Sequence, residues 1–111
     1  MFSLPDTVAI QSTVLNAVAS GNAAVITLNA VTNNYHVLDW LVWSYADTPT
    51  NGNILVHDVT NNTDLLSADI TTSGPGGLFF SERGMRCPRN SAITVTLADG
   101  SVNGKLTIQY R

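Results

Sequence analysis

A chain of 111 residues has room for one domain with one modest core, and its lone cysteine, Cys87, excludes a disulfide within the sequence. Only 12% of the residues are charged, about half the usual share in soluble domains, and the net charge is −3. Residues 1–82 hold seven acidic groups and no basic one, so the chain lacks the broad cationic surface that nucleic-acid binding requires.

The N-terminal region has no pattern typical of a secretion signal or a membrane span. It lacks a basic first segment, and polar residues interrupt its apolar runs. No apolar run in the sequence approaches the roughly 20 residues that a spanning helix needs. We therefore expect folding in a reducing cytoplasm and no membrane contact. Residues 1–20 are expected to form either an edge strand or an arm.

Short strands dominate the predicted elements in chain order. Residues 6–15 are predicted to form an edge strand; a helix over residues 6–19 is the alternative, and the β-branched residues of this segment favour the strand. Further strands are predicted over residues 23–28, 37–45, 53–59 and 64–70, separated by turns rich in Asn and Gly. Residues 74–77, Gly-Pro-Gly-Gly, are predicted to be a turn before a short apolar run at residues 78–80.

Two segments with alternating apolar and polar residues close the chain. Residues 92–98 and 105–111 each place their apolar side chains on one face, which is typical of half-buried strands. Between them lie Asp-Gly and Asn-Gly, dipeptides that supply the positive φ angles of tight hairpin turns. The pattern predicts that these two strands form an antiparallel hairpin.

The number and spacing of these segments predict the fold class. About eight short strands and no long helix favour an all-β protein, an antiparallel β-sandwich of jelly-roll or immunoglobulin-like type. We find no internal repeat and no linker, so residues 1–111 are expected to form a single β-sandwich domain.

The strand at residues 37–45 is unusual because it is apolar on both faces. Small antiparallel sandwiches usually leave one sheet face in water, and Trp and Tyr are enriched at interfaces. The second face is therefore covered either by another chain or by a segment of the same chain, and a platform for stacking sugars is a third alternative. Of the two faces, one carries Leu38, Trp40 and Val42, and the other carries Val37, Leu41, Trp43 and Tyr45.

Catalytic and metal-binding motifs are not found in the sequence. His36, His57 and Cys87 have no diagnostic spacing, and His57 and Asp58 point to opposite faces of a strand. The Gly-Pro-Gly-Gly stretch lacks the Lys-Ser/Thr of a phosphate loop. We therefore predict no catalytic residue, no metal, no cofactor and no enzymatic activity.

The stretch SERGMRCPRN, residues 81–90, holds three of the five basic side chains. Arg83, Arg86 and Arg89 could lie in a solvated loop, contact nucleic acid or activate the Cys87 thiol. An interface is the interpretation we favour, because arginine pairs with carboxylates bidentately and the first part of the chain is acidic. We expect Trp43, Tyr45 and these three arginines to lie at contacts with other chains.

Residues 37–111 resemble small β-sandwich proteins of tailed bacteriophages, including head decoration or cement proteins. The resemblance rests on the order of a strand ending in Trp-Ser-Tyr, an Asn-Gly turn, and then DITTSGPGG, AITVTLADG and GKLTIQY. It implies a structural protein that binds the major capsid protein on the capsid surface as a homo-oligomer, a dimer or a trimer, after synthesis in the host cytoplasm. It implies no catalytic residue.

A second function belongs to another class. A carbohydrate- or receptor-binding β-sandwich module of a phage fibre or tail would use the faces of Trp and Tyr side chains to stack on sugars. The sequence leaves both functions open, as it does the question of whether the strand that contains Trp40 and Trp43 is internal or at an interface.

Overall fold

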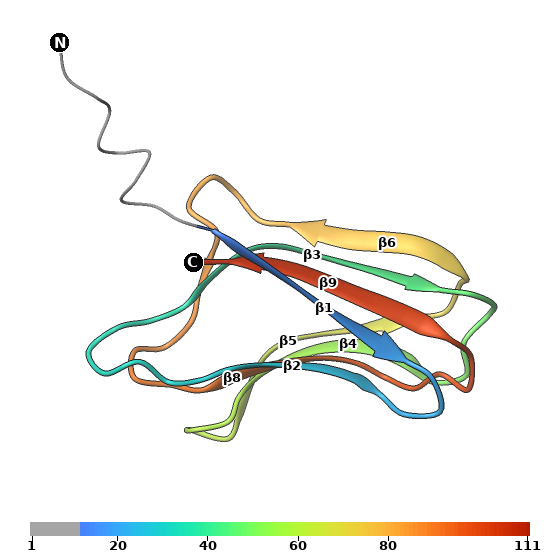
Figure 1. Ribbon diagram of the computed structural model, residues 1–111, viewed down its shortest axis with the longest axis horizontal. Helices are drawn as coiled ribbons and strands as arrows, with labels where there is room; N and C mark the ends of the chain where they lie inside the picture. The colour runs from blue at the N-terminus through green and yellow to red at the C-terminus, as the bar shows by residue number, and fades with distance from the viewer. Residues whose placement is uncertain (1–11) are drawn as a thin grey trace, which may run out of the picture.

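The computed structural model describes residues 12–111, which form two antiparallel sheets packed face to face (Figure 1). Within this range no helix is long and apolar enough to cross a membrane. Most of the edge strand predicted at residues 6–15 lies outside the described residues. The strands are β1 (Thr13–Ala19), β2 (Ala24–Leu28), β3 (Val37–Tyr45), β4 (Gly52–Asp58), β5 (Thr63–Ile70), β6 (Gly74–Phe79), β7 (Met85–Arg86), β8 (Ile93–Leu97) and β9 (Gly104–Tyr110).

The strand order identifies the sandwich as a jelly roll. The first sheet, sheet A, has the order β1-β9-β3-β6 with β7 also paired to β3, and the second, sheet B, has the order β2-β8-β4-β5. If the two-residue β7 is left out and the remaining eight strands are numbered 1 to 8 in chain order, the two sheets have the strand orders 1-8-3-6 and 2-7-4-5. This is the jelly-roll arrangement. An immunoglobulin fold would place the first two strands side by side in one sheet, whereas β1 and β2 lie in opposite sheets here. The predicted antiparallel β-sandwich is confirmed.

The core lies between the two sheets and follows from the alternation of the strands. In β4 and β8 every second residue is buried, because successive side chains of a strand point to opposite faces. The same alternation in β9 buries Leu106 and Ile108 against them. The fully buried residues of the core include Leu38, Leu41, Tyr45, Ile54, Val56, Ile93, Val95, Leu97, Leu106 and Ile108.

The hairpin predicted for the last two strands is wrong. β8 pairs with β2 and β4 in sheet B, whereas β9 pairs with β1 and β3 in sheet A. The connection turns at Gly100 and Ser101, which have positive φ angles of 63° and 61°, and it carries the chain across the core from one sheet to the other. Turn-forming dipeptides thus mark a corner of the sandwich, and the strands find partners elsewhere in the chain.

The predicted turn at residues 74–77 is wrong as well, because these residues form the first part of β6. β6 pairs with the end of β3, with Gly76 opposite Trp43 and Gly74 opposite Tyr45. A Cβ atom on Gly76 would lie 2.6 Å from the indole nitrogen of Trp43. Glycine therefore stands in a strand here because the Trp43 side chain fills the space above it.

A β-bulge in β3 sets the direction in which its aromatic residues point. The pairing of β3 with β9 shifts register between Leu38 and Trp40. Leu38 faces the core before the bulge, and Leu41, Trp43 and Tyr45 face it after the bulge. One extra residue at a bulge reverses the face of the sheet to which each following side chain points. Trp40 and Val42 consequently lie on the outer face of sheet A, opposite to the face of Leu38.

Candidate functional site

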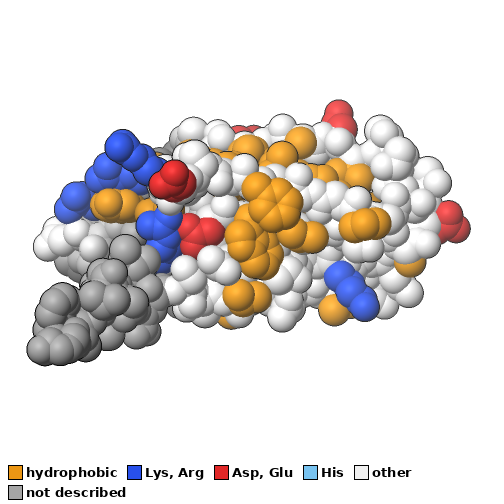
Figure 2. Space-filling model, turned by 90° about the horizontal axis from the view of Figure 1, so that it is seen from above, with side chains coloured by type: hydrophobic (Ala, Val, Ile, Leu, Met, Phe, Trp, Pro, Cys, Tyr) orange, Lys and Arg blue, Asp and Glu red, His pale blue; other side chains and the backbone are white. Residues whose placement is uncertain are grey.

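The outer face of sheet A carries a group of apolar side chains that the described residues leave exposed or only half-buried. We call this group, Val14, Val18, Trp40, Val42 and Phe79, the apolar face. Phe79 is 74% exposed and Val18 is 63% exposed, although both lie on strands. Trp40 and Phe79 are cross-strand partners whose ring centroids lie 6.5 Å apart. In Figure 1 sheet A is the upper layer, so Figure 2, seen from above, shows hydrophobic side chains gathered at the centre of this face.

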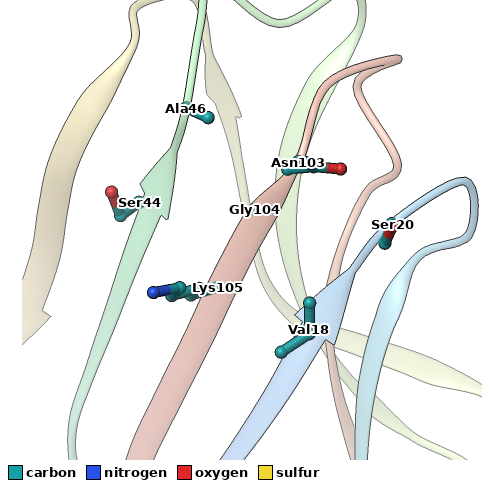
Figure 3. Close-up of a pocket in the computed structure, with 7 residues that line it drawn as sticks. All are labelled: Val18, Ser20, Ser44, Ala46, Asn103, Gly104 and Lys105. Carbon is teal, nitrogen blue, oxygen red and sulfur yellow. The ribbon is translucent and has the colours of Figure 1, made fainter.

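Polar residues of β9 run through the apolar face. Thr107 donates a hydrogen bond of 2.7 Å to the Asn16 side chain on β1, so both groups are satisfied within the sheet. At one end Lys105 lies between Val18 of β1 and Ser44 of β3, as Figure 3 shows, and the three residues border a hollow of about 340 Å³. The face therefore has an aromatic centre and a cationic side chain at the end where β3 finishes.

The opposite end of the sheet gathers arginines. We call Tyr35, Arg83, Arg86, Arg89 and Arg111 the basic end. The Arg86 guanidinium lies 4.0 Å from the centroid of the Tyr35 ring, and that of Arg89 lies 5.9 Å from it. Arg111 pairs with Asp39, with 2.8 Å between Nε and the carboxylate. In Figure 2 basic side chains cluster at one end of the same surface that carries the apolar face.

The three arginines predicted from the sequence are exposed and lie together, but the two predicted aromatic residues face inward. Tyr45 is 1% exposed and donates a 2.6 Å hydrogen bond to the Ala98 carbonyl, and burial raises the pKa of its hydroxyl. Trp43 packs against the core. Tyr45 is therefore a core residue, and neither residue belongs to the surface described above.

The residues that sequence reasoning missed are Trp40, Phe79, Tyr35 and Arg111. Trp40 and Trp43 lie on opposite faces, and choosing between them required the position of the bulge. Phe79 carried a signal in the sequence, since an apolar run of three residues in a half-buried strand must turn at least one side chain outward. Tyr35 and Arg111 are distant in sequence from residues 81–90 and are brought there by β3, β7 and β9.

The Cys87 thiol does not have the surroundings of a reactive group. The side chain is buried, and burial, together with the negative charge of Asp58, raises its pKa to about 11. A thiol with this pKa is protonated at neutral pH and is a poor nucleophile. The arginines that flank Cys87 in the sequence lie at the surface over the Tyr35 ring, whereas the thiol is buried, so the alternative of an activated thiol is not supported.

The remaining titratable groups make local contacts. His57 pairs with Asp64 across the β4–β5 hairpin at 2.8 Å, and the His36 ring bonds the Asn29 carbonyl at 2.7 Å. Asp58 is buried and accepts hydrogen bonds from Asn61 and Ser91. No group of three or more His, Cys, Asp or Glu side chains in residues 12–111 is arranged to hold a metal ion.

Comparison with known proteins identifies the fold and no family. No protein-family model matches the sequence, and no curated protein matches it. A capsid structure of the Helicobacter pylori bacteriophage KHP30 is 14% identical with a TM-score of 0.53, covering 89% of this chain and 86% of that one. A pilus protein of Bacillus endospore appendages is 13% identical with a TM-score of 0.51, covering 90% and 82%. The CBM36-1 domain of a xylanase from a Trinervitermes trinervoides hindgut metagenome is 9% identical with a TM-score of 0.50, covering 90% and 95%. Likeness at this level of identity establishes the β-sandwich fold.

Proposed function

We propose that this chain is a non-enzymatic structural protein of a virus particle. In this proposal it is a capsid decoration or cement protein of a tailed bacteriophage, which forms a homo-oligomer and binds the major capsid protein on the capsid surface. The observation that carries the proposal is the apolar face, because a sheet face on which an exposed Phe79 lies beside a half-buried Trp40 is best explained by a protein partner.

Burial of the apolar face supplies the free energy of association. Covering a side chain such as Phe79 or Val18 contributes about 1.5–3 kcal/mol, and part of this offsets the loss of translational and rotational freedom. A protein that binds only the assembled shell stabilises that shell by mass action. The low content of charged residues and the likeness to a phage capsid structure support the same function.

Self-association is tested by sedimentation of the purified protein over a concentration series. We expect a dimer or a trimer, and Phe79→Ser should raise its dissociation constant about tenfold or more. Val59→Ser is the matched control, because Val59 is also exposed but lies in the turn between β4 and β5, away from sheet A. A wild-type monomer at the highest soluble concentration would contradict the homo-oligomer.

The cement function is tested separately by co-sedimentation with assembled phage capsids and with unassembled capsid protein. We expect binding to the assembled capsids alone and a rise in the temperature at which they come apart. Equal binding to both forms, or no effect on capsid melting, would remove the cement function and leave a self-associating β-sandwich.

A second candidate is a carbohydrate- or receptor-binding module of a phage fibre or tail. It is favoured by the half-buried Trp40 ring and the exposed Phe79 ring, which could stack on sugars, and by the likeness to the CBM36-1 domain. A glycan array distinguishes the two functions. Specific sugar binding that Trp40→Ala abolishes and Trp43→Phe leaves intact would favour the module, and an array without binding would favour the capsid protein.

A further inference from the structure

The basic end contains a hollow that is separate from the apolar face. It has a volume of about 460 Å³ and is lined by Tyr35, Val37, Arg83, Gly84, Arg86 and Arg111. Three guanidinium groups thus border one small space, which is a high local density in a chain with five basic residues. The lining residues come from three distant parts of the sequence, so the hollow is built by the fold.

Backbone hydrogen bonds hold the arginines of this hollow in place. β7 pairs Arg86 with Val37, and the amide of the next residue, Cys87, donates to the His36 carbonyl at 2.9 Å. Gly84 has a φ of 71° and packs so closely that a Cβ atom there would lie 2.5 Å from Val37. Ordered backbone on both sides of Arg86 reduces the conformational freedom that a ligand would otherwise have to restrict.

The side chains of the hollow are partly ordered as well. Arg86 lies over the Tyr35 ring at 4.0 Å, which orients its planar guanidinium and leaves the edges with N–H donors free of the ring. Arg111 is tied to Asp39 and donates to the Glu82 carbonyl at 3.1 Å. Among residues 12–111, the ion pairs are those of Arg111 with Asp39 and of His57 with Asp64, so Arg83 and Arg86 have no carboxylate partner there.

We propose that this hollow binds the carboxylates of an acidic segment of a partner protein, with Arg83 and Arg86 as the two residues that bind them. The forked guanidinium group matches a carboxylate bidentately. A long polyanion such as nucleic acid is disfavoured, because the rest of the chain is acidic and would repel it, whereas a segment with two or three carboxylates fits within the basic end. The inference rests on the proposed function, since it names the chemistry by which the partner is recognised.

Titration of isotope-labelled protein with a hexaglutamate peptide, followed by amide shifts in NMR spectra, tests the site. We expect shifts centred on Tyr35, Gly84 and Arg86, and no shifts with hexaglutamine. Arg86→Ala should raise the dissociation constant of the peptide about tenfold. Lys105→Ala removes the same charge at the other end of the molecule and should change it less than about twofold, which separates the site from the effect of net charge.

Three outcomes would overturn the inference: no shift with hexaglutamate, shifts spread evenly over all basic residues, or tighter binding of a thymidine oligonucleotide at the same residues. The last outcome would indicate that the hollow binds phosphate groups and not carboxylates. None of these outcomes affects self-association through the apolar face, which is measured without the peptide. Failure of self-association and of capsid binding with intact peptide binding would instead remove the proposed function and leave the carboxylate site.

Discussion

Cys87 illustrates how burial overrides the sequence neighbourhood of a residue. Its pKa of about 11 means that the native thiol stays protonated, so we expect native protein at about pH 8 to react with a thiol reagent only as fast as it unfolds. Absorbance of the released thiolate over time measures this rate, and the same reagent in denaturant gives the rate of the exposed thiol. Complete reaction of native protein within the time of the denatured control would show that the thiol is accessible.

The raised pKa of Cys87 also predicts how stability changes at alkaline pH. The folded thiol ionises at about pH 11 and the unfolded one at about 9.0, so the free energy of unfolding falls as pH rises through this window. Buried Tyr45, whose pKa is also raised, acts in the same direction at higher pH. Urea unfolding at about pH 8 and pH 10.5 should show a smaller loss of stability in Cys87→Ala than in the wild type. An equal loss in both proteins would contradict the assignment to Cys87.

Asp58 predicts the response to acid. Burial by itself acts to raise its pKa, but the hydrogen bonds from Asn61 and Ser91 outweigh burial and hold the pKa below the usual 3.8. The stability that this carboxylate contributes is therefore present above about pH 4 and is lost as pH falls through the lower folded pKa. Asp58→Ala also leaves buried polar partners unpaired, and we expect a loss of about 1–3 kcal/mol near neutral pH by urea unfolding.

The matched control for Asp58 is Asp64→Ala. Asp64 is 63% exposed and has His57 as its side-chain partner, so its removal should change stability by less than about 1 kcal/mol. If the two variants lost the same free energy of unfolding, the buried network of Asp58, Asn61 and Ser91 would contribute no more stability than the exposed pair of Asp64 and His57.

At the scale of elements, β6 depends on the absence of a side chain at Gly76. Gly76→Ala would place a Cβ atom 2.6 Å from the Trp43 indole, and relief of this clash requires the ring to move from the core. We expect a loss of about 1–3 kcal/mol in the free energy of unfolding and a change in tryptophan fluorescence. Gly77→Ala is the control: its Cβ would lie 3.2 Å from the Leu41 carbonyl oxygen and 3.2–3.3 Å from the Phe79 and Val42 side chains, so it needs a shift of only a few tenths of an ångström and a smaller loss is expected. Equal effects of the two variants would argue against the packing of Trp43 over Gly76.

Sequence periodicity predicted the strands more reliably than their partners. β3 begins and ends at the predicted residues, and β8 and β9 differ from their predicted ranges by one residue at each end. Alternation is a local property that burial of one face imposes on any strand. Pairing is a non-local property, and the Asp-Gly and Asn-Gly dipeptides between β8 and β9 fit a corner between sheets as well as a hairpin.

The candidate site could be predicted only in part, again because composition is a local property and strand pairing is not. That the strand at residues 37–45 is apolar on both faces is visible in its composition, and so is the cluster of arginines at residues 83–89. Which aromatic residue faces outward depends on the bulge between Leu38 and Trp40, which no residue type in the sequence marks. Assembly of Tyr35 and Arg111 around the arginines depends on the pairing of β3 with β7 and β9.

At the scale of the whole molecule, one surface combines two kinds of binding free energy. The centre of the outer face of sheet A offers apolar area, which is insensitive to salt, and the basic end offers charge, which salt screens (Figure 2). In the proposed function the apolar face joins copies of the chain, and the basic end binds an acidic segment of the shell. The two contacts should therefore respond independently to salt and to mutation.

Salt separates the two contacts in one experiment. Between about 0.05 M and 0.5 M NaCl the screening length falls from roughly 14 Å to 4 Å, so binding of the hexaglutamate peptide should weaken about tenfold or more. Self-association measured by sedimentation should stay the same or become stronger, because burial of apolar surface does not depend on charge. The double substitution Arg83→Ala with Arg86→Ala should act like high salt: it weakens peptide binding and leaves the oligomer intact. If the double variant were a monomer, the arginines would belong to the contact between copies, and the acidic segment they bind would be one of this chain.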